Sequence, residues 1–513
     1  MAAMTQPHVV FMNIAATGHM NPTLPVVASL VSRGCRVTYF VEASMRAVVE
    51  AAGASWMPFR YANHAFTGIL REPGQLSALS AAERAAVGLA EDAPEQLTGF
   101  PFSTLYNSQL VLPQLLDDVR ALSPRASAIV CDPFLPCGRV VAHVLGAAPI
   151  SLLTMPGPGV FTLPDEVEGL PWMEGPRQWI RREYGIDLFE DTSVLEFYSP
   201  VLNLVTTLED FYSPPRTARQ VHRFGRAPFR CVGALLDPKV ARIENVDVAP
   251  GLGPGADCLG VSPALRAARG AREGGRRVVL VSLGTVATGK FWGEPFGPVA
   301  AGNAEAPKGT KSLMEHTGRE FCLFLLRAVF EAVARDPGML AVVAVGPHMA
   351  DAMEALPEPP ANTVVCESVP QVDLLPLCDA FVTHGGANSM HEALSFGVPL
   401  CVVPIFGDQP SNADTVARIG AGVSFRNPLL TLSGDSLSDA LGDIGGGDFQ
   451  STFRVAAREA SKRLAAADGV GGTADAVLGA AGARDVARRA EAGASAKEAS
   501  AAPAGQQAHM FGA

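Results

Sequence analysis

The sequence predicts an α/β protein made of two parallel, doubly wound units. Over residues 8–41 a strand, a turn, a helix and a second strand follow one another, which is the building block of a parallel sheet. The same alternation begins again at 277–283 (RVVLVSL) and continues to about residue 419. The length of 513 residues also suits two or three domains.

The first unit starts with residues 8–16 (HVVFMNIAA), which are expected to form a buried strand before a turn at 17–19. Pro22 suits the first turn of a helix that runs to about Arg33, where Gly34 ends it. The other elements expected in this unit are strands at 36–41, 127–131 and 149–154 and a helix at 137–146.

The second unit is expected to alternate strands and helices more regularly. Its elements are strands at 277–283, 339–345, 363–366, 379–383 and 399–403 and helices at 318–335, 372–377, 387–396, 409–419 and 452–467, with a Gly- and Pro-rich excursion at 286–317. Changes in composition divide the chain into a first domain at 1–240, a linker at 241–276, a second domain at 277–450, C-terminal helices at 451–483 and a disordered tail at 484–513.

The composition argues against several classes of protein. Hydrophobic residues make up 48% of the chain, enough for sizeable cores, and the net charge of -11 disfavours nucleic acid or anionic lipid as a partner. The nine cysteines include no C-x-x-C pair, which favours free thiols in a reducing compartment. No basic residue precedes Arg33, and the apolar stretch at 140–155 is too short and interrupted to span a bilayer. We therefore expect a cytoplasmic protein with no integral membrane segment.

The densest chemical signal lies at residues 368–412. Residues 384–386 (His-Gly-Gly) end a strand and open a helix, where free backbone N–H groups and the positive helix end attract a diphosphate. Asn388 and Ser389 add neutral donors, and Glu392 lies one turn further along the helix, where it can accept from ribose hydroxyls. A Gly-rich turn with a capping Asn can be purely structural, but the full string with its spacing indicates a ligand site.

Further polar residues follow other strands. Asp408 and Gln409 offer partners for sugar hydroxyls, His19 follows the first strand, and Asp132 ends the strand at 127–131. Taken singly, His19 and Asp132 are also compatible with structural turn residues. No G-x-G-x-x-G follows the first strand, so a nicotinamide enzyme is disfavoured, and no H-E-x-x-H or H-x-x-E-H pair indicates a metal site.

The string FVTHGGANSMHEALSFGVPLCVVPIFGDQPSNA (381–413) resembles the donor-binding signature of the UDP-dependent family 1 glycosyltransferases. GHMNPTLPVVASLVSRG (18–34) is similar to their macrolide-glycosyltransferase-like branch, and VVLVSLGT (278–285) and VGALL (232–236) also match. The resemblance covers roughly residues 8–60, 127–155 and 230–480. It implies a GT-B fold, in which an acceptor-binding and a nucleotide-sugar-binding Rossmann-like domain face each other across a cleft and C-terminal helices cross back.

The resemblance also implies roles for individual residues. His19 would be the general base, for which an imidazole with a pKa near physiological pH is suited, and Asp132 would orient it and stabilise the imidazolium. Ser282 and Thr285 would contact the donor phosphates, although a simple ST-turn is the alternative, and Gln371 would contact the ribose or uracil unless it only begins a helix. The remaining implied donor-binding residues are His384, Gly386, Asn388, Ser389, Glu392, Asp408 and Gln409.

One departure from the family concerns recognition of the base. Relatives usually carry a tryptophan that stacks on the uracil where this chain has Ser368. Stacking on an aromatic ring contributes roughly 1–3 kcal/mol, so its loss would weaken nucleotide binding. Phe291, Trp292 or Phe296 in the excursion at 286–317 could supply a substitute ring.

The sequence therefore leads us to expect an inverting hexosyltransferase that needs no metal ion or cofactor. It would move a hexose, expected to be glucose, from a UDP-sugar to a hydroxyl of a small lipophilic acceptor. A TDP-sugar is the nearest alternative donor. A nucleotide-sugar epimerase and a catalytically inactive binding protein of the same fold are the alternatives from other functional classes.

Overall fold

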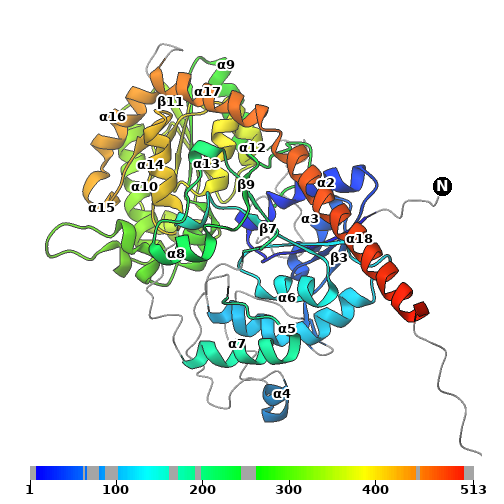
Figure 1. The fold of residues 1–513 in the computed structure, drawn as a ribbon. Helices are drawn as coiled ribbons and strands as arrows, with labels where there is room; N and C mark the ends of the chain where they lie inside the picture. Colours follow the sequence, from blue (N-terminus) through cyan, green and yellow to red (C-terminus); the bar gives the residue numbers. More distant parts are fainter. Residues whose placement is uncertain are drawn as a thin grey trace, which may run out of the picture.

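The structure, a computed structural model, describes residues 7–61, 64–65, 80–86, 102–160, 171–190, 198–243, 262–445 and 451–501. These residues contain two large parallel sheets with helices on both faces, which Figure 1 shows as two lobes. The predicted α/β architecture with two Rossmann-like units is confirmed.

The first sheet has the strand order β3-β2-β1-β6-β7-β8-β9, and all neighbours are parallel. Its strands are His8–Met12 (β1), Arg36–Phe40 (β2), Ser55–Met57 (β3), Ala128–Cys131 (β6), Ala148–Leu153 (β7), Leu202–Val205 (β8) and Phe229–Cys231 (β9). The chain reverses its direction of winding between β1 and β6. The carboxyl ends of these two strands therefore open onto a crevice, the usual ligand position in such sheets.

Alternate residues of β1 face two different cores, as expected from the period of two in a strand. Val10 packs with α5 and α6, whereas Val9 packs with α2 and α18. These helices are Thr23–Ser32 (α2), Phe102–Arg120 (α5), Pro136–Leu145 (α6) and Gly469–Ala501 (α18). Figure 1 shows α18, in red, running from the second domain across the first domain beside α2.

The second sheet has the order β12-β11-β10-β13-β14-β15, again entirely parallel. Its strands are Arg277–Ser282 (β10), Met339–Ala344 (β11), Thr363–Cys366 (β12), Ala380–Thr383 (β13), Leu400–Val402 (β14) and Gly422–Ser424 (β15). Val279 packs with helices α10 and α16 on one face, and Val278 packs with α9, α13, α14 and α17 on the other. The winding reverses between β10 and β13, which places a second crevice at their carboxyl ends.

Most elements predicted for the second unit end within a residue or so of their expected bounds. The helices are Pro263–Glu273 (α9), Gly318–Ala334 (α10), Ala387–Ser395 (α13), Gln409–Arg418 (α14), Gly434–Gly445 (α16) and Thr452–Ala466 (α17). The other described helices of the two units are α1 (Thr17–Met20), α3 (Arg46–Ala51), α4 (Ala81–Ala86), α7 (Pro171–Tyr184), α8 (Ala218–Phe224), α11 (Met349–Ala355), α12 (Gln371–Leu374) and α15 (Pro428–Thr431). The strands β4 (Arg60–Tyr61) and β5 (His64–Ala65) form a hairpin.

The first predicted strand is too long. β1 ends at Met12, and α1 replaces the predicted turn at 17–19. The strand stops because the Asn13 side chain turns inward, donating to the His19 carbonyl at 3.0 Å and to the Tyr39 hydroxyl at 3.1 Å.

Part of the predicted linker is a helix of the second domain. α9 begins with Pro263 and covers one face of the second sheet through four buried side chains, Ala264, Leu265, Ala268 and Ala271. Small alanines at helical spacing form this face, and the neighbouring arginines and glycines concealed the pattern in the sequence. Residues 244–261 of the predicted linker lie outside the described residues.

The predicted disordered tail is also wrong over much of its length, because α18 continues to Ala501. Arg484 donates from Nε to the Gly146 carbonyl at 2.6 Å, and Ser127 donates to Asp485 at 2.9 Å. The segment is rich in alanine, a strong helix former, so it extends a helix that earlier residues have already docked. Residues 502–513 lie outside the described part of the chain. No helix in the described part has the length and apolarity required to cross a bilayer.

Candidate active site

The crevices of the two sheets face each other and form one cleft. Every predicted site residue except Asp132 lines it: His19, Ser282, Thr285, Gln371, His384, Gly386, Asn388, Ser389, Glu392, Asp408 and Gln409. Asp132 lies directly behind His19, with its side chain only 1% exposed. The sequence motifs therefore converge on a single place, although they are spread between residues 19 and 409 of the chain.

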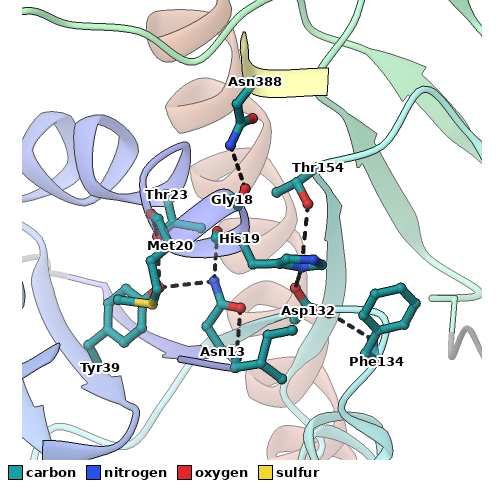
Figure 2. Close-up of polar contacts among 11 residues, drawn as sticks. Asn13, Gly18, His19, Met20, Thr23, Tyr39, Asp132, Phe134, Thr154 and Asn388 are labelled. Atoms are coloured by element: carbon teal, nitrogen blue, oxygen red, sulfur yellow. Dashed lines mark hydrogen bonds and ion pairs between the residues drawn. The ribbon is translucent and has the colours of Figure 1, made fainter. Parts of the chain in front are cut away.

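His19 and Asp132 form a closely coupled pair (Figure 2). The distance between Nδ1 of His19 and Oδ2 of Asp132 is 2.5 Å, and the other carboxylate oxygen accepts the Phe134 backbone N–H at 2.8 Å. The His19 ring lies 5.3 Å from the Phe134 ring, and the Thr154 hydroxyl is 3.4 Å from Nδ1. Because Nδ1 faces the carboxylate, Nε2 is the nitrogen that can accept a proton from a ligand.

The environment makes His19 a stronger base than an ordinary histidine. Burial lowers the pKa of its ring, but the charge and hydrogen bond of Asp132, together with the charge of Asp408, raise the pKa by more. The net pKa therefore lies above its ordinary value. A basic imidazole held by a buried carboxylate can remove a proton from a hydroxyl group.

His384 occupies a much tighter position in the second domain. A Cβ on Gly284 would lie 2.5 Å from the His384 ring, and a Cβ on Gly386 would lie 2.6 Å from it, so both positions require glycine. Burial lowers the pKa of His384 to about 4, offset in part by a hydrogen bond to the Ser282 backbone. The ring is therefore neutral at physiological pH in the absence of a ligand.

The N-terminus of α13 faces the first domain across the cleft. Asn388, one of the predicted donor-binding residues, donates to the Gly18 carbonyl at 2.6 Å, which joins the diphosphate motif to the turn that carries His19 (Figure 2). On the same helix His391 approaches the Thr207 hydroxyl at 3.0 Å. Its Nδ1 lies 2.6 Å from the Ala387 carbonyl, which can only accept, so Nδ1 carries the proton and Nε2 accepts from Thr207.

Glu392, predicted to accept from ribose hydroxyls, already has two protein partners. Its Oε2 accepts from Nε2 of Gln371 at 2.7 Å, and its Oε1 pairs with the Arg242 guanidinium. Arg242 also lines the cleft and was not predicted as a site residue, because it lies in the segment assigned to the linker. The place of Arg242 in the site is visible only in the structure, where it pairs with Glu392, 150 positions further along the chain.

Asp408 and Gln409 differ in how free they are to bind a sugar. The Gln409 side-chain oxygen accepts the backbone N–H groups of Ile405 and Phe406 at 2.8 and 3.1 Å, so it closes the turn before α14. Asp408 accepts from Asn412 at 2.8 Å, and burial raises the pKa of its carboxyl group. Ser282 and Thr285 lie beside the turn after β10, as predicted.

Of the three aromatic rings considered for base stacking, Phe291 alone lines the cleft. Trp292 instead stacks on His348 at 4.9 Å and donates to Asp351, and Phe296 is buried in the second-domain core. Residues 286–317 thus fold into three short helical turns at Val286–Lys290, Gly297–Asn303 and Leu313–Glu315. They bring the Phe291 ring to one wall of the cleft.

Within the described residues, no cluster of three His, Cys, Asp or Glu side chains is arranged to hold a metal ion. The acidic residues of the cleft are engaged elsewhere: Asp132 with His19, Glu392 with Arg242 and Gln371, and Asp408 with Asn412. The cleft offers a ligand a basic imidazole on one side and a helix N-terminus with neutral donors on the other, and its lining also includes Arg242 and Lys290.

Several known proteins are similar to this chain in sequence or fold. Residues 356–448 match the family model described as UDP-glucoronosyl and UDP-glucosyl transferase. NDP-glycosyltransferase YjiC of Bacillus licheniformis is 25% identical over 422 residues, which cover 82% of this chain and 85% of that protein.

Solved structures of glycosyltransferases share the fold. The glycotransferase of kitacinnamycin has a TM-score of 0.61 at 21% identity, covering 93% of this chain and 100% of that one. Spinosyn rhamnosyltransferase SpnG complexed with thymidine diphosphate has a TM-score of 0.52 at 20% identity, covering 90% and 96%. The family match, these relatives and the two facing Rossmann-like domains show a glycosyltransferase with the GT-B fold that is similar to enzymes of family 1.

Proposed function

We propose that this glycosyltransferase transfers a hexose, with glucose as the expected sugar, from a UDP-sugar to a hydroxyl of a small lipophilic acceptor. The observation that carries the proposal is the pairing of His19 with Asp132 at 2.5 Å, opposite the N-terminus of α13 across one cleft. This arrangement supplies a base for the acceptor and a neutral anion site for the donor.

The reaction proceeds with inversion and without a metal ion or other cofactor. Nε2 of His19 takes the hydroxyl proton while the acceptor oxygen bonds to the anomeric carbon. The bond from that carbon to the diphosphate oxygen breaks, and its electron pair leaves with the nucleoside diphosphate. Asp132 stabilises the imidazolium that forms, and an α-linked donor yields a β-glycoside.

The departing diphosphate is stabilised by the second domain. The N-terminus of α13, where the preceding residue Gly386 supplies no side-chain cap, favours negative charge at this position. His384, Ser282 and Thr285 lie around the same point. Because these donors are fixed before the reaction, they need not reorganise as charge develops on the leaving oxygen.

The wall beside His19 supports a lipophilic acceptor. Phe134 and Met155 line the cleft next to the histidine, and Val299 lies on the wall contributed by the second domain. The acceptor hydroxyl would therefore reach Nε2 from an apolar surface. The described cysteines are all free, which supports a reducing compartment such as the cytoplasm.

A TDP-sugar remains the second candidate donor, supported by the structural similarity to SpnG, which was solved with thymidine diphosphate. Glucose labelled in the sugar, supplied as UDP-glucose and as TDP-glucose, should be tested against phenolic, macrolide and sterol acceptors. We expect label to move to an acceptor from UDP-glucose. Label that stays on the nucleotide as an epimer would indicate an epimerase, and intact donor with all acceptors would indicate a binding protein.

A further inference from the structure

The segment that joins the two domains enters the nucleotide side of the cleft through Arg242. The Arg242 guanidinium pairs with Oε1 of Glu392, and both side chains are largely buried, at 11% and 8% exposure. Few arginines reach such burial without a fixed role, because an unpaired charge in this environment would be strongly unfavourable. The pair thus fixes the direction of one carboxylate oxygen.

The neighbouring residue is held just as firmly by the first domain. The Ile243 N–H donates to Oδ1 of Asn21 at 2.8 Å, and its carbonyl accepts from Nδ2 of the same side chain at 3.1 Å. Asn21 directly follows α1, the turn of helix that contains His19. The two bonds fix the backbone beside Arg242 relative to the turn that carries the base.

Glu392 is held from the other side by its own domain. Its second oxygen accepts from Gln371 at 2.7 Å, so each carboxylate oxygen has a protein donor and a remaining lone pair. A ribose hydroxyl that binds there meets a carboxylate whose rotation is already restricted. Such restriction lowers the conformational cost of binding.

We propose that Arg242 is a positioning residue for the nucleotide: it fixes the Glu392 carboxylate for the ribose hydroxyls and, through Ile243 and Asn21, sets that carboxylate relative to the turn carrying His19. The inference rests on the proposed function, in which Glu392 faces the ribose. The segment that joins the two domains would then help the enzyme to select a nucleotide with an intact ribose.

The alternative role for a cation at this position is direct contact with the diphosphate. The two roles differ in which part of the nucleotide they affect. A residue that acts through Glu392 affects a ligand with ribose hydroxyls and not one without them. A residue that contacts the diphosphate affects both ligands equally.

Calorimetric titration of UDP and 2′,3′-dideoxy-UDP separates these roles. We expect the wild type to prefer UDP, and Arg242→Gln to weaken UDP binding by about 10-fold, as for loss of a charged hydrogen bond, while dideoxy-UDP changes by less than about twofold. Arg242→Lys should restore part of the preference. In steady state Arg242→Gln should raise the donor KM more than it lowers kcat.

Arg277→Gln is the matched control, because Arg277 pairs with Asp336 at the opposite end of β10 and should leave both affinities unchanged. Equal weakening of both nucleotides by Arg242→Gln, or no weakening of UDP, would overturn the positioning role while leaving the proposed function intact. A wild type that binds neither nucleotide would refute the proposed function and this inference together.

Discussion

His19 and His384 follow strands at opposite sides of the same cleft, yet their surroundings give them opposite properties. His19 lies 2.5 Å from a buried carboxylate, Asp132. Burial lowers the pKa of His19, but the charge and hydrogen bond of Asp132, together with the charge of Asp408, raise this pKa by more. His384 is packed against glycines, and burial lowers its pKa to about 4 despite a hydrogen bond to the Ser282 backbone. One imidazole is therefore prepared to take a proton, and the other is kept neutral.

The difference shows how a fold can assign two tasks to one side-chain type. A carboxylate partner stabilises the imidazolium of His19 before any substrate binds, which suits a base. His384 has no such stabilisation, so a bound diphosphate would itself be the charge that raises its pKa. His384 thus presents a neutral ring on one side of the cleft, whereas His19 is supported by a carboxylate on the other.

The largest expected effect on activity comes from replacing His19, the proposed base. His19→Ala should lower kcat by roughly 10²- to 10⁴-fold, the usual contribution of a positioned general base, while UDP affinity stays nearly constant. Single-turnover transfer and calorimetric titration of UDP measure the two quantities separately. Transfer close to the wild-type rate would remove His19 from the mechanism and with it the contrast between the two histidines.

The carboxylate should control the pH dependence. In the wild type, activity is lost as His19 takes up a proton, and this acidic limb of kcat/KM should lie above the ordinary histidine pKa of 6.5. Asp132→Asn removes the main upward influence and leaves the burial that lowers the pKa, so the limb should move to lower pH. The maximal rate should also fall, because the imidazolium is no longer stabilised.

A pH–rate profile of both proteins tests this prediction. Asp408→Asn offers a graded comparison, since the charge of Asp408 is a weaker influence on the same ring and should shift the limb in the same direction by less. An acidic limb that does not move in Asp132→Asn would show that another group titrates.

A smaller effect is expected on the donor side. His384→Gln should raise the donor KM by about 10-fold, the loss of one hydrogen bond to a charged group, with little change in the acidic limb. The limb should stay in place because the pKa of His384, about 4, lies below the working range. Initial rates at varied donor concentration and pH measure both; a displaced limb would mean that His384 shares the role of the base.

Motifs formed by adjacent residues were predictable from the sequence. The distant pair of His19 and Asp132 was expected only from the family resemblance, and other partners brought together by folding were not predicted. The apolar run at 277–283 is typical of a strand buried on both faces, and the His-Gly-Gly that follows β13 carries its chemistry within a single turn. Arg242 lacked any such local signal, because its role depends on Glu392, 150 positions further along the chain. The Thr207 and His391 contact was missed for the same reason.

The two incorrect boundaries have a common physical cause. α9 and the last turns of α18 are rich in alanine, which is a strong helix former but contributes little to a hydrophobic pattern. Composition suggested a linker and a disordered tail in these places. The packing of α9 becomes visible only when the facing surface is known, as with Ala264 and Ala268 in the second-domain core.

The smallest expected effect concerns metal ions, and it tests the donor side of the comparison most directly. If the N-terminus of α13 and the neutral donor groups beside it stabilise the diphosphate, no divalent ion is needed at the leaving group. Dialysis against EDTA should then change kcat by less than about twofold, since the fixed donors remain in place. Metal analysis of the dialysed protein should accompany the assay, followed by addition of Mg²⁺ or Mn²⁺. Activity lost on chelation and recovered with either ion would show that a cation, and not His384 with the helix terminus, stabilises the negative charge of the diphosphate.

The same experiment on His384→Gln tests the ring directly. A variant rescued by Mg²⁺ would mean that the ion can replace the imidazole, whereas an unrescued variant supports a contribution from the ring itself.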